Sequence, residues 1–306
     1  TPPSPTPRTV GCYALGALGR AAAAVGVGPD EALVLRATLV AASARLVLTS
    51  SLHPLYVAVP PPRGDFAHGA TPPEVAKLIE GRMGGGGGGA TAAAVSATSS
   101  ATTLACAVAA VAAAVGVDHA LLARMRTGAV GVASPAADPA YRLYAALALD
   151  DLVCERPGGA IAAAFRCSPH ALQGLQDAAG GAAYRLAKFA REAGEPFTLV
   201  ADVLATVERQ VSAGVRGELV ALTAIEAVRG SRARRLFHAG FKSVRDVAAA
   251  SEARLREVLQ AGGGERGISS RLVRRIKGHA AELHALEAAR EALDALASAR
   301  ARRLEA

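Results

Sequence analysis

Basic side chains gather in residues 231–250, which read SRARRLFHAGFKSVRDVAAA. Guanidinium and ammonium groups bind phosphate well, so the chemistry that this cluster favours is polyanion binding rather than proton or acyl transfer. At 3.6 residues per turn, three basic side chains fall opposite three apolar ones. The basic set is Arg234, Arg235 and His238, with Arg232 at the margin, and the apolar set is Ala233, Leu236 and Phe237.

The same stretch carries the signals of two short helices joined by a tight turn. Ser231 is a candidate N-cap, Gly240 stands where a left-handed residue ends a helix, and Ser243 with Asp246 approximates a capping box. This pattern resembles a helix-hairpin-helix, in which turn amides and a helix N-terminus contact a phosphate. The alternative is a solvated face on a small helical domain. The predicted DNA-binding residues are Arg229, Arg232, Arg234, Arg235 and Lys242.

A second candidate is the segment CSPHALQGLQDAAGGAAYRLAKFARE at 167–192, where Ser168-Pro169 predicts a helix start. One face of this helix is apolar, and a separate stripe holds Gln173, Asp177, Gly181, Tyr184, Lys188 and Arg191. Amide, aromatic and basic groups along one helix suit single-stranded nucleic acid, which is bound by stacking and phosphate contact together. An ordinary bundle helix with one solvent-exposed face explains the spacing equally well.

Nothing in the sequence predicts catalysis or a metal site. The four cysteines (Cys12, Cys106, Cys154 and Cys167) form no CxxC pair, which favours a reduced intracellular compartment over a disulfide framework. No GxxxxGK[ST] phosphate cradle is present, so no cofactor is expected for this chain. Asp150 and Asp151 are adjacent and would point to different sides of a helix. His53, on an apolar segment, is expected to be structural.

Composition predicts an all-α protein. Of the 306 residues 51% are apolar, many of them alanine, while tryptophan is absent and aromatics make up 4%. Alanine favours helices and is depleted from strands. Its weak hydrophobicity also argues against a membrane span at 101–117. The net charge of +8 is uneven: residues 221–306 hold 17 basic and 10 acidic side chains, whereas residues 1–220 are nearly balanced.

The local composition and the positions of helix-breaking residues along the chain predict five regions. Residues 1–24 comprise a disordered start and the beginning of a helical segment, which the family resemblance given below implies to be the end of a winged-helix-like segment. Residues 25–60 and 104–213 form a helical bundle, whose short breaks suit antiparallel neighbours and which the same resemblance implies to be ratchet-like. Residues 61–103, which are rich in proline and then glycine, are expected to be a disordered low-complexity insertion. Residues 214–285 form the helix-hairpin-helix domain, and residues 286–306 a helical tail.

Taken together, these segments resemble the C-terminal helical domains of a Ski2-like superfamily 2 DNA helicase, closest to the helicase-like portion of DNA polymerase theta. The stretch LHPLYVAVP at 52–60 is similar to a conserved-looking "LH-x-LY-x-x-x-P" ending in that family. Residues 207–251 carry its "GV-x-x-EL", "RAR-x-L" and "AGF-x-S-x-x-D-x-A" features. Two departures stand out: the chain contains neither ATPase domain, and Gly180-Gly181 lies near where some relatives place a bulky stacking side chain.

The resemblance implies a nuclear accessory region of an ATP-dependent DNA repair helicase that binds single-stranded or branched DNA. ATP and magnesium would belong to motor domains outside this chain, which are also possible partners of it, so the chain is not expected to be an enzyme on its own. The ratchet-helix residues implied to lie near DNA are Gln173, Gln176, Tyr184, Arg185, Lys188 and Arg191. The alternative is a protein-interaction scaffold that keeps the helical fold without binding DNA.

Overall fold

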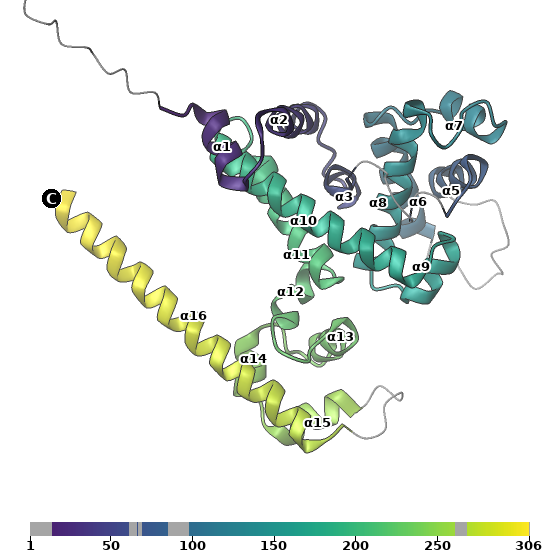
Figure 1. The fold of residues 1–306 in the computed structure, drawn as a ribbon. Helices are drawn as coiled ribbons and strands as arrows, with labels where there is room; N and C mark the ends of the chain where they lie inside the picture. The colour runs from purple at the N-terminus through teal and green to yellow at the C-terminus, as the bar shows by residue number, and fades with distance from the viewer. Residues whose placement is uncertain (1–13, 61–65, 67–68, 85–97, 261–267, 306) are drawn as a thin grey trace, which may run out of the picture.

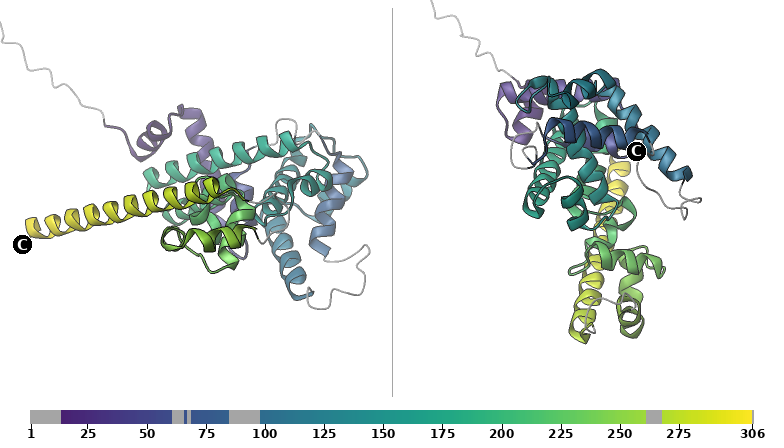
Figure 2. Two further views of the ribbon diagram at one scale, coloured as in Figure 1. Left: turned by 90° about the horizontal axis from the view of Figure 1, so that it is seen from below. Right: turned by 90° about the vertical axis from the view of Figure 1, so that its right-hand side faces the viewer.

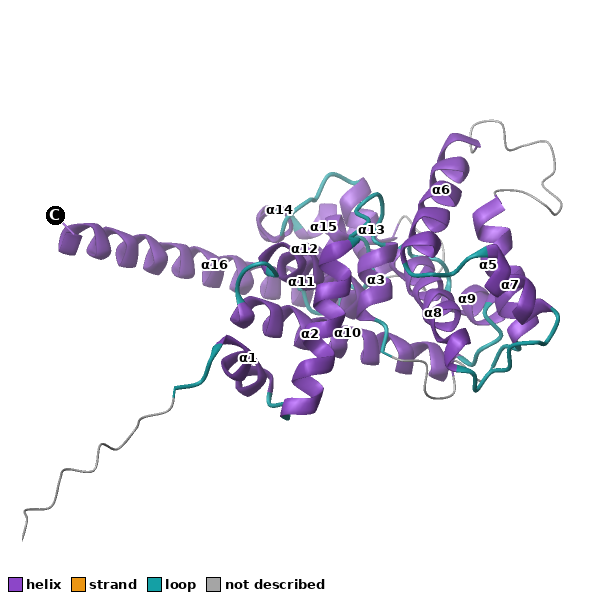
Figure 3. Cartoon of the chain, turned by 90° about the horizontal axis from the view of Figure 1, so that it is seen from above, coloured by secondary structure: helices purple, strands orange, loops and turns teal. Residues whose placement is uncertain are grey.

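The protein is all-helical wherever its structure is described. The computed structural model describes residues 14–60, 66, 69–84, 98–260 and 268–305, and within them it contains no strand (Figure 3). The helices fall into an N-terminal layer, a central bundle and a C-terminal hairpin domain (Figure 1). The prediction of an all-α fold is therefore confirmed.

The long helix α10 (Pro169–Ala193) organises the first two parts. It packs along its length against α11 (Thr198–Ala213). On another side it contacts α1 (Ala17–Val25) and α2 (Pro29–Ala44). Leu186 and Phe189 of α10 join Leu39 of α2 and Leu204 of α11 in one apolar cluster. As predicted, the Ser168 hydroxyl caps α10 by accepting a hydrogen bond from the Ala171 amide at 3.0 Å.

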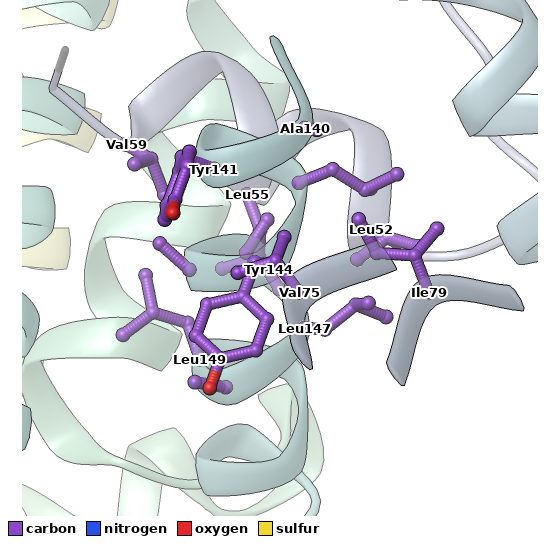
Figure 4. Packing of buried hydrophobic residues seen from close by; sticks show 14 of the residues in the cluster. Leu52, Leu55, Val59, Val75, Ile79, Ala140, Tyr141, Tyr144, Leu147 and Leu149 are labelled. Atoms are coloured by element: carbon purple, nitrogen blue, oxygen red, sulfur yellow. The ribbon is translucent and has the colours of Figure 1, made fainter. Parts of the chain in front are cut away.

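The central bundle is built around α8 (Asp138–Val153), which is buried at most positions. Tyr144 is the largest of its fully enclosed side chains; its hydroxyl donates to the Phe165 carbonyl at 2.7 Å. Figure 4 shows Tyr144 among leucines and valines from several helices. The remaining bundle elements are α3 (Leu52–Ala58), α5 (Pro72–Gly84), α6 (Thr98–Ala114), α7 (His119–Arg126), the 3-10 turn η1 (Pro135–Ala137) and α9 (Gly158–Ala164).

Helix α5 corrects the prediction that residues 61–103 form a disordered insertion. Val75 and Ile79 have no exposed surface and lie in the same core as Tyr144. Arg82, at the end of α5, makes a bidentate ion pair with the buried Asp151, with distances of 3.1 and 2.5 Å. The flanking proline- and glycine-rich sequence is typical of disorder, and for that reason the helix between these flanks was not predicted. The last residues of the predicted insertion, 98–103, are helical too, because α6 begins at Thr98. Residues 61–65, 67–68 and 85–97 of the insertion lie outside the described residues, as do residues 1–13.

Residues 215–260 and 268–283 form a hairpin domain with its own apolar core. Its helices are α12 (Gly217–Thr223), α13 (Gly230–His238), α14 (Val244–Ala249), α15 (Glu252–Gln260) and the first part of α16 (Ser270–Glu305). Instead of a second short helix pair and a separate tail, α16 is one helix of 36 residues. Figures 1 and 2 show its C-terminal part extending beyond the other helices as a straight rod.

No single helix in the described part of the chain is long and apolar enough to cross a membrane. One bent pair, Leu104–Ala114 with His119–Arg126, passes the same test by length and composition, with a bend of 90° between its helices.

Candidate nucleic-acid interface

The exposed face of α10 carries the polar stripe predicted from the sequence. Tyr184 is 57% exposed, which is unusual for so large a ring, and the other tyrosines of the described chain are buried or half-buried. Gly181 and Arg191 are also exposed, and Lys188 is half-buried. Because these positions follow one another by three or four residues, their side chains line up along one side of the helix. The predicted stripe is therefore present as a continuous surface.

The hollow that adjoins this stripe lies between α10 and α11 and has a volume of about 450 Å³. Tyr184, Lys188 and Arg191 line one wall, and Glu208 and Arg209 line the other. A phenol ring beside three cations offers a stacking surface and phosphate partners to the same strand. The two acidic residues in the lining, Glu192 and Glu208, limit the positive potential of the groove.

Arg209 also lines the groove, although it was not among the residues predicted from the sequence. Its guanidinium donates to the Ala205 carbonyl at 3.3 Å and to the Thr206 hydroxyl at 3.5 Å, which holds it on the exposed side of α11. The available signal was amphipathic spacing in VERQVSA. That signal places Arg209 on the polar face of its own helix, but it does not show that this face meets the stripe of α10.

The two predicted glutamines and Arg191 have partners within the protein. Gln176 donates to the Val211 carbonyl of α11 at 2.7 Å, so its amide joins two helices instead of facing outward with the stripe. Gln173 donates to Asp177 at 3.0 Å, and Arg191 forms an exposed ion pair with Asp202 at 3.3 Å. Arg185 is exposed but lies outside the stripe, because it is one position along the helix from Tyr184.

Helices α13 and α14 follow one another across a short turn, and α13 starts at Gly230 with Arg229 rather than Ser231 as its N-cap. Gly240 takes a positive φ of 96° in the turn, and Ser243 and Asp246 form the capping box that opens α14. Both features agree with the sequence signals. The hairpin is thus a well-specified local structure.

Three of the five predicted arginines and lysines of this domain are engaged with the protein. Arg234 does not face outward as predicted, because its guanidinium contacts Glu155 of the bundle and Glu218 of α12, each with a closest distance of 2.5 Å. The hydrogen bond to Glu155 raises the pKa of Arg234. Arg235 donates to the Leu259 carbonyl and Arg232 to the Ala227 carbonyl, at 2.9 and 2.8 Å. The exposed members of the predicted set are Arg229 and Lys242.

The turn amides of the hairpin are also engaged, which corrects the expectation that they meet a phosphate. The amides of Lys242 and Ser243 both donate to a carboxylate oxygen of Asp246 at 2.9 Å. The amides of Gly240 and Phe241 donate to carbonyls of α13 at 3.0 Å. A phosphate would have to displace the Asp246 carboxylate to reach the first pair. The basic side chains, and not the turn backbone, are the groups that this hairpin presents.

Polar residues in the bundle interior have structural partners. Asp150 accepts a hydrogen bond from the Ser51 hydroxyl at 3.2 Å, and Asp151 is paired with Arg82 and Arg156. Nδ1 of the buried His53 accepts from the Val47 amide at 2.9 Å, and burial lowers the pKa of the ring. No group of three or more His, Cys, Asp or Glu among the described residues could hold a metal ion.

These features define an all-helical region, without strands in its described residues, that carries an exposed stripe of basic and aromatic side chains on α10. Residues 95–194 match the family model for the helical domain of the DNA polymerase Q helicase-like region. This stretch runs from the start of α6 to the end of α10, and so it includes the stripe. The match supports a polymerase-theta helicase-like helical region there. A comparison of the chain with curated proteins found no match.

Proposed function

We propose that this chain binds single-stranded or branched DNA as an accessory region of a DNA repair helicase of the polymerase-theta type. The observation that carries the proposal is the exposed stripe of α10, in which Tyr184 stands beside Lys188 and Arg191 on the edge of the groove to α11. An exposed ring flanked by cations is suited to stacking on a base while the neighbouring phosphates are neutralised. The family match over the same helix supports this use.

The hairpin domain supplies a second, weaker contact in this proposal. Residues 221–306 hold 17 basic and 10 acidic side chains, so this part of the chain attracts a polyanion at long range. Arg229 and Lys242 are the exposed members of the predicted set, while Arg234 is held by carboxylates. We therefore assign DNA contact in this domain to Arg229 and Lys242, and a positioning role to Arg234.

The wider setting of the proposal follows from the family. ATP and magnesium would be used by helicase motor domains that act with this region, and the chain itself would need no cofactor and carry out no reaction. Its partners would be DNA and those motor domains, and it would act in the nucleus.

Fluorescence anisotropy with a labelled single-stranded oligonucleotide tests the proposal directly. We expect binding at low salt that weakens steeply as salt rises, because each phosphate contact releases a condensed counterion. Tyr184→Ala should weaken binding by about 5- to 150-fold if one base stacks on the ring, which corresponds to roughly 1–3 kcal/mol. Lys188→Glu with Arg191→Glu should also flatten the salt dependence. The matched control is Lys77→Glu with Arg124→Glu, which makes the same charge change on α5 and α7.

The rival function is a protein-interaction scaffold without DNA affinity. It predicts no oligonucleotide binding even at low salt, and that outcome would reject our proposal. If the Tyr184 variant and the control variant lose the same amount of DNA affinity, the stripe is not the contact. Non-specific attraction to the basic C-terminal part would then explain the binding. A scaffold would instead show a protein partner that is retained by wild type and lost when exposed surface residues are changed.

A further inference from the structure

Among the described residues, none packs against the C-terminal part of α16. Ile276 and Ala280 are buried in the hairpin domain, but every residue from 285 to 298 is exposed. At about 1.5 Å per residue this stretch alone extends roughly 20 Å into solvent. Figure 2 shows the helix projecting beyond the other elements. Most of the stability of a helix in a protein comes from the packing of its apolar face. A second helix packed against this exposed stretch would therefore stabilise it.

An apolar face is present and lies away from the face that packs on the hairpin domain. Leu286, Leu293 and Leu296 are 68%, 66% and 67% exposed. At 100° per residue they fall within an arc of about 80°, centred some 140° round the helix from Ile276 and Ala280. Six of the fourteen residues 285–298 are alanine, and such small side chains let a second helix approach closely.

The charges along the helix indicate which partner fits. Residues 282–294 contain Glu282, Glu287, Glu291 and Asp294 against the single Arg290, whereas residues 300–303 contain three arginines and no acid. A second copy laid antiparallel brings the acidic stretch of each helix alongside the basic stretch of the other. A parallel copy would place like charges side by side, which is unfavourable.

We propose that two copies of this chain associate through residues 282–305 of α16, packed antiparallel with Leu293 of one copy near Leu296 of the other. The arrangement is two-fold symmetric, so each copy uses the same surface and the contact closes on itself. The dimer would carry two bundles and two hairpin domains at its opposite ends. This inference rests on the free helix and not on DNA binding, and its test needs no DNA.

Sedimentation velocity of the full chain over a range of concentrations tests the association. We expect the mass to rise from 30.8 kDa towards twice that value as concentration increases. Leu286→Ala, Leu293→Ala and Leu296→Ala together should leave a monomer at every concentration, since alanine keeps the helix but removes the apolar face. The matched control replaces three equally exposed leucines outside α16, namely Leu15, Leu33 and Leu199. A wild-type chain that stays monomeric, or a triple variant that still dimerises, overturns the proposal.

Disulfide trapping tests the orientation in a background whose four native cysteines are replaced by serine. In the antiparallel register, Ala289 of one copy lies near residue 300 of the other, while the two Ala289 positions are about 16 Å apart along the axis. Mixed Ala289→Cys and Arg300→Cys chains should therefore oxidise to a mixed covalent dimer. Covalent dimers of the Ala289→Cys chain alone would show a parallel pair and overturn the antiparallel arrangement. Circular dichroism confirms that each variant remains helical.

Discussion

Arg234 on α13 and Glu155, two residues after the end of α8, form a two-point ion pair that ties the hairpin domain to the bundle. Nε of Arg234 lies 2.9 Å from one carboxylate oxygen, and Nη2 lies 2.5 Å from the other. The side chains are 24% and 18% exposed, so water screens the pair only partly. Glu155 reaches it from a backbone with a positive φ of 62°, a conformation that few non-glycine residues adopt. The most conspicuous arginine of the hairpin motif thus joins two parts of the protein.

Breaking this pair should loosen the hairpin domain without unfolding it. We expect Arg234→Ala to lower the free energy of unfolding by about 1–3 kcal/mol, because the half-buried Glu155 loses its charged partner. Limited proteolysis should then cut the 214–217 connection faster. Arg254→Ala, which removes an exposed pair with Glu257, is the control and should cost less than about 1 kcal/mol. Equal destabilisation by both variants would show that the Arg234–Glu155 pair contributes no more to stability than an exposed ion pair does.

The two adjacent glycines of α10 should respond oppositely to alanine. A Cβ on Gly181 would meet nothing within 4 Å, so Gly181→Ala should stabilise the helix by about 0.5–1 kcal/mol. A Cβ on Gly180 would lie 2.9 Å from the Ser212 hydroxyl oxygen, which donates to Glu208 at 3.2 Å and would have to move. In thermal denaturation, Gly181→Ala should raise the melting temperature. Gly180→Ala should raise it less, or should lower it.

Ser212→Ala provides the companion test of that difference. In the Ser212→Ala background, Gly180→Ala should recover part of the gain in stability, because the hydroxyl oxygen that the new Cβ would meet is no longer present. If Gly180→Ala stabilises the wild-type chain as much as Gly181→Ala does, the close approach of α10 and α11 at this point is not a constraint.

The sequence predicted those parts of the fold that depend on local signals. The Ser168 cap of α10, the polar stripe above its apolar face, and the turn from Gly240 to the Ser243–Asp246 box all depend on residues a few positions apart. Helix α5 was missed because its proline start and glycine-rich flank are also typical of disordered sequence, while the evidence for it is distant: Ile79 meets the core around Tyr144, and Arg82 meets Asp151.

The direction of individual side chains was the least predictable feature of the candidate site. Helical periodicity puts Arg234 on the polar face of α13, but only the docking of the bundle supplies Glu155, 79 residues earlier. Gln176 is a similar case, because its partner is a carbonyl of α11. Amphipathic spacing identifies which face of a helix is polar, and it does not identify whether that face meets solvent or another domain.

Asp150 should make stability depend on pH. Burial raises the pKa of its carboxyl above the ordinary value of 3.8, opposed by the hydrogen bond from Ser51. The folded state therefore binds this proton more tightly than the unfolded state, and the contribution to stability falls as pH rises through the folded pKa. Asp150→Asn, which can still accept from Ser51, should raise the melting temperature at neutral pH. That gain should shrink as pH falls towards 4; a gain that does not vary with pH would contradict this account.

Asp246 should restrain DNA binding by the hairpin. Its carboxylate occupies the amides of Lys242 and Ser243 and adds a negative charge beside the exposed Lys242. Asp246→Ala should cost about 1 kcal/mol of stability through loss of the capping box. The same change leaves two amide donors available to a phosphate, so anisotropy at low salt should show tighter binding of single-stranded DNA. Glu31→Ala makes the same charge change on α2 and serves as the control. An affinity that rises equally in both variants would reflect net charge alone, and the hairpin would then have no part in the contact.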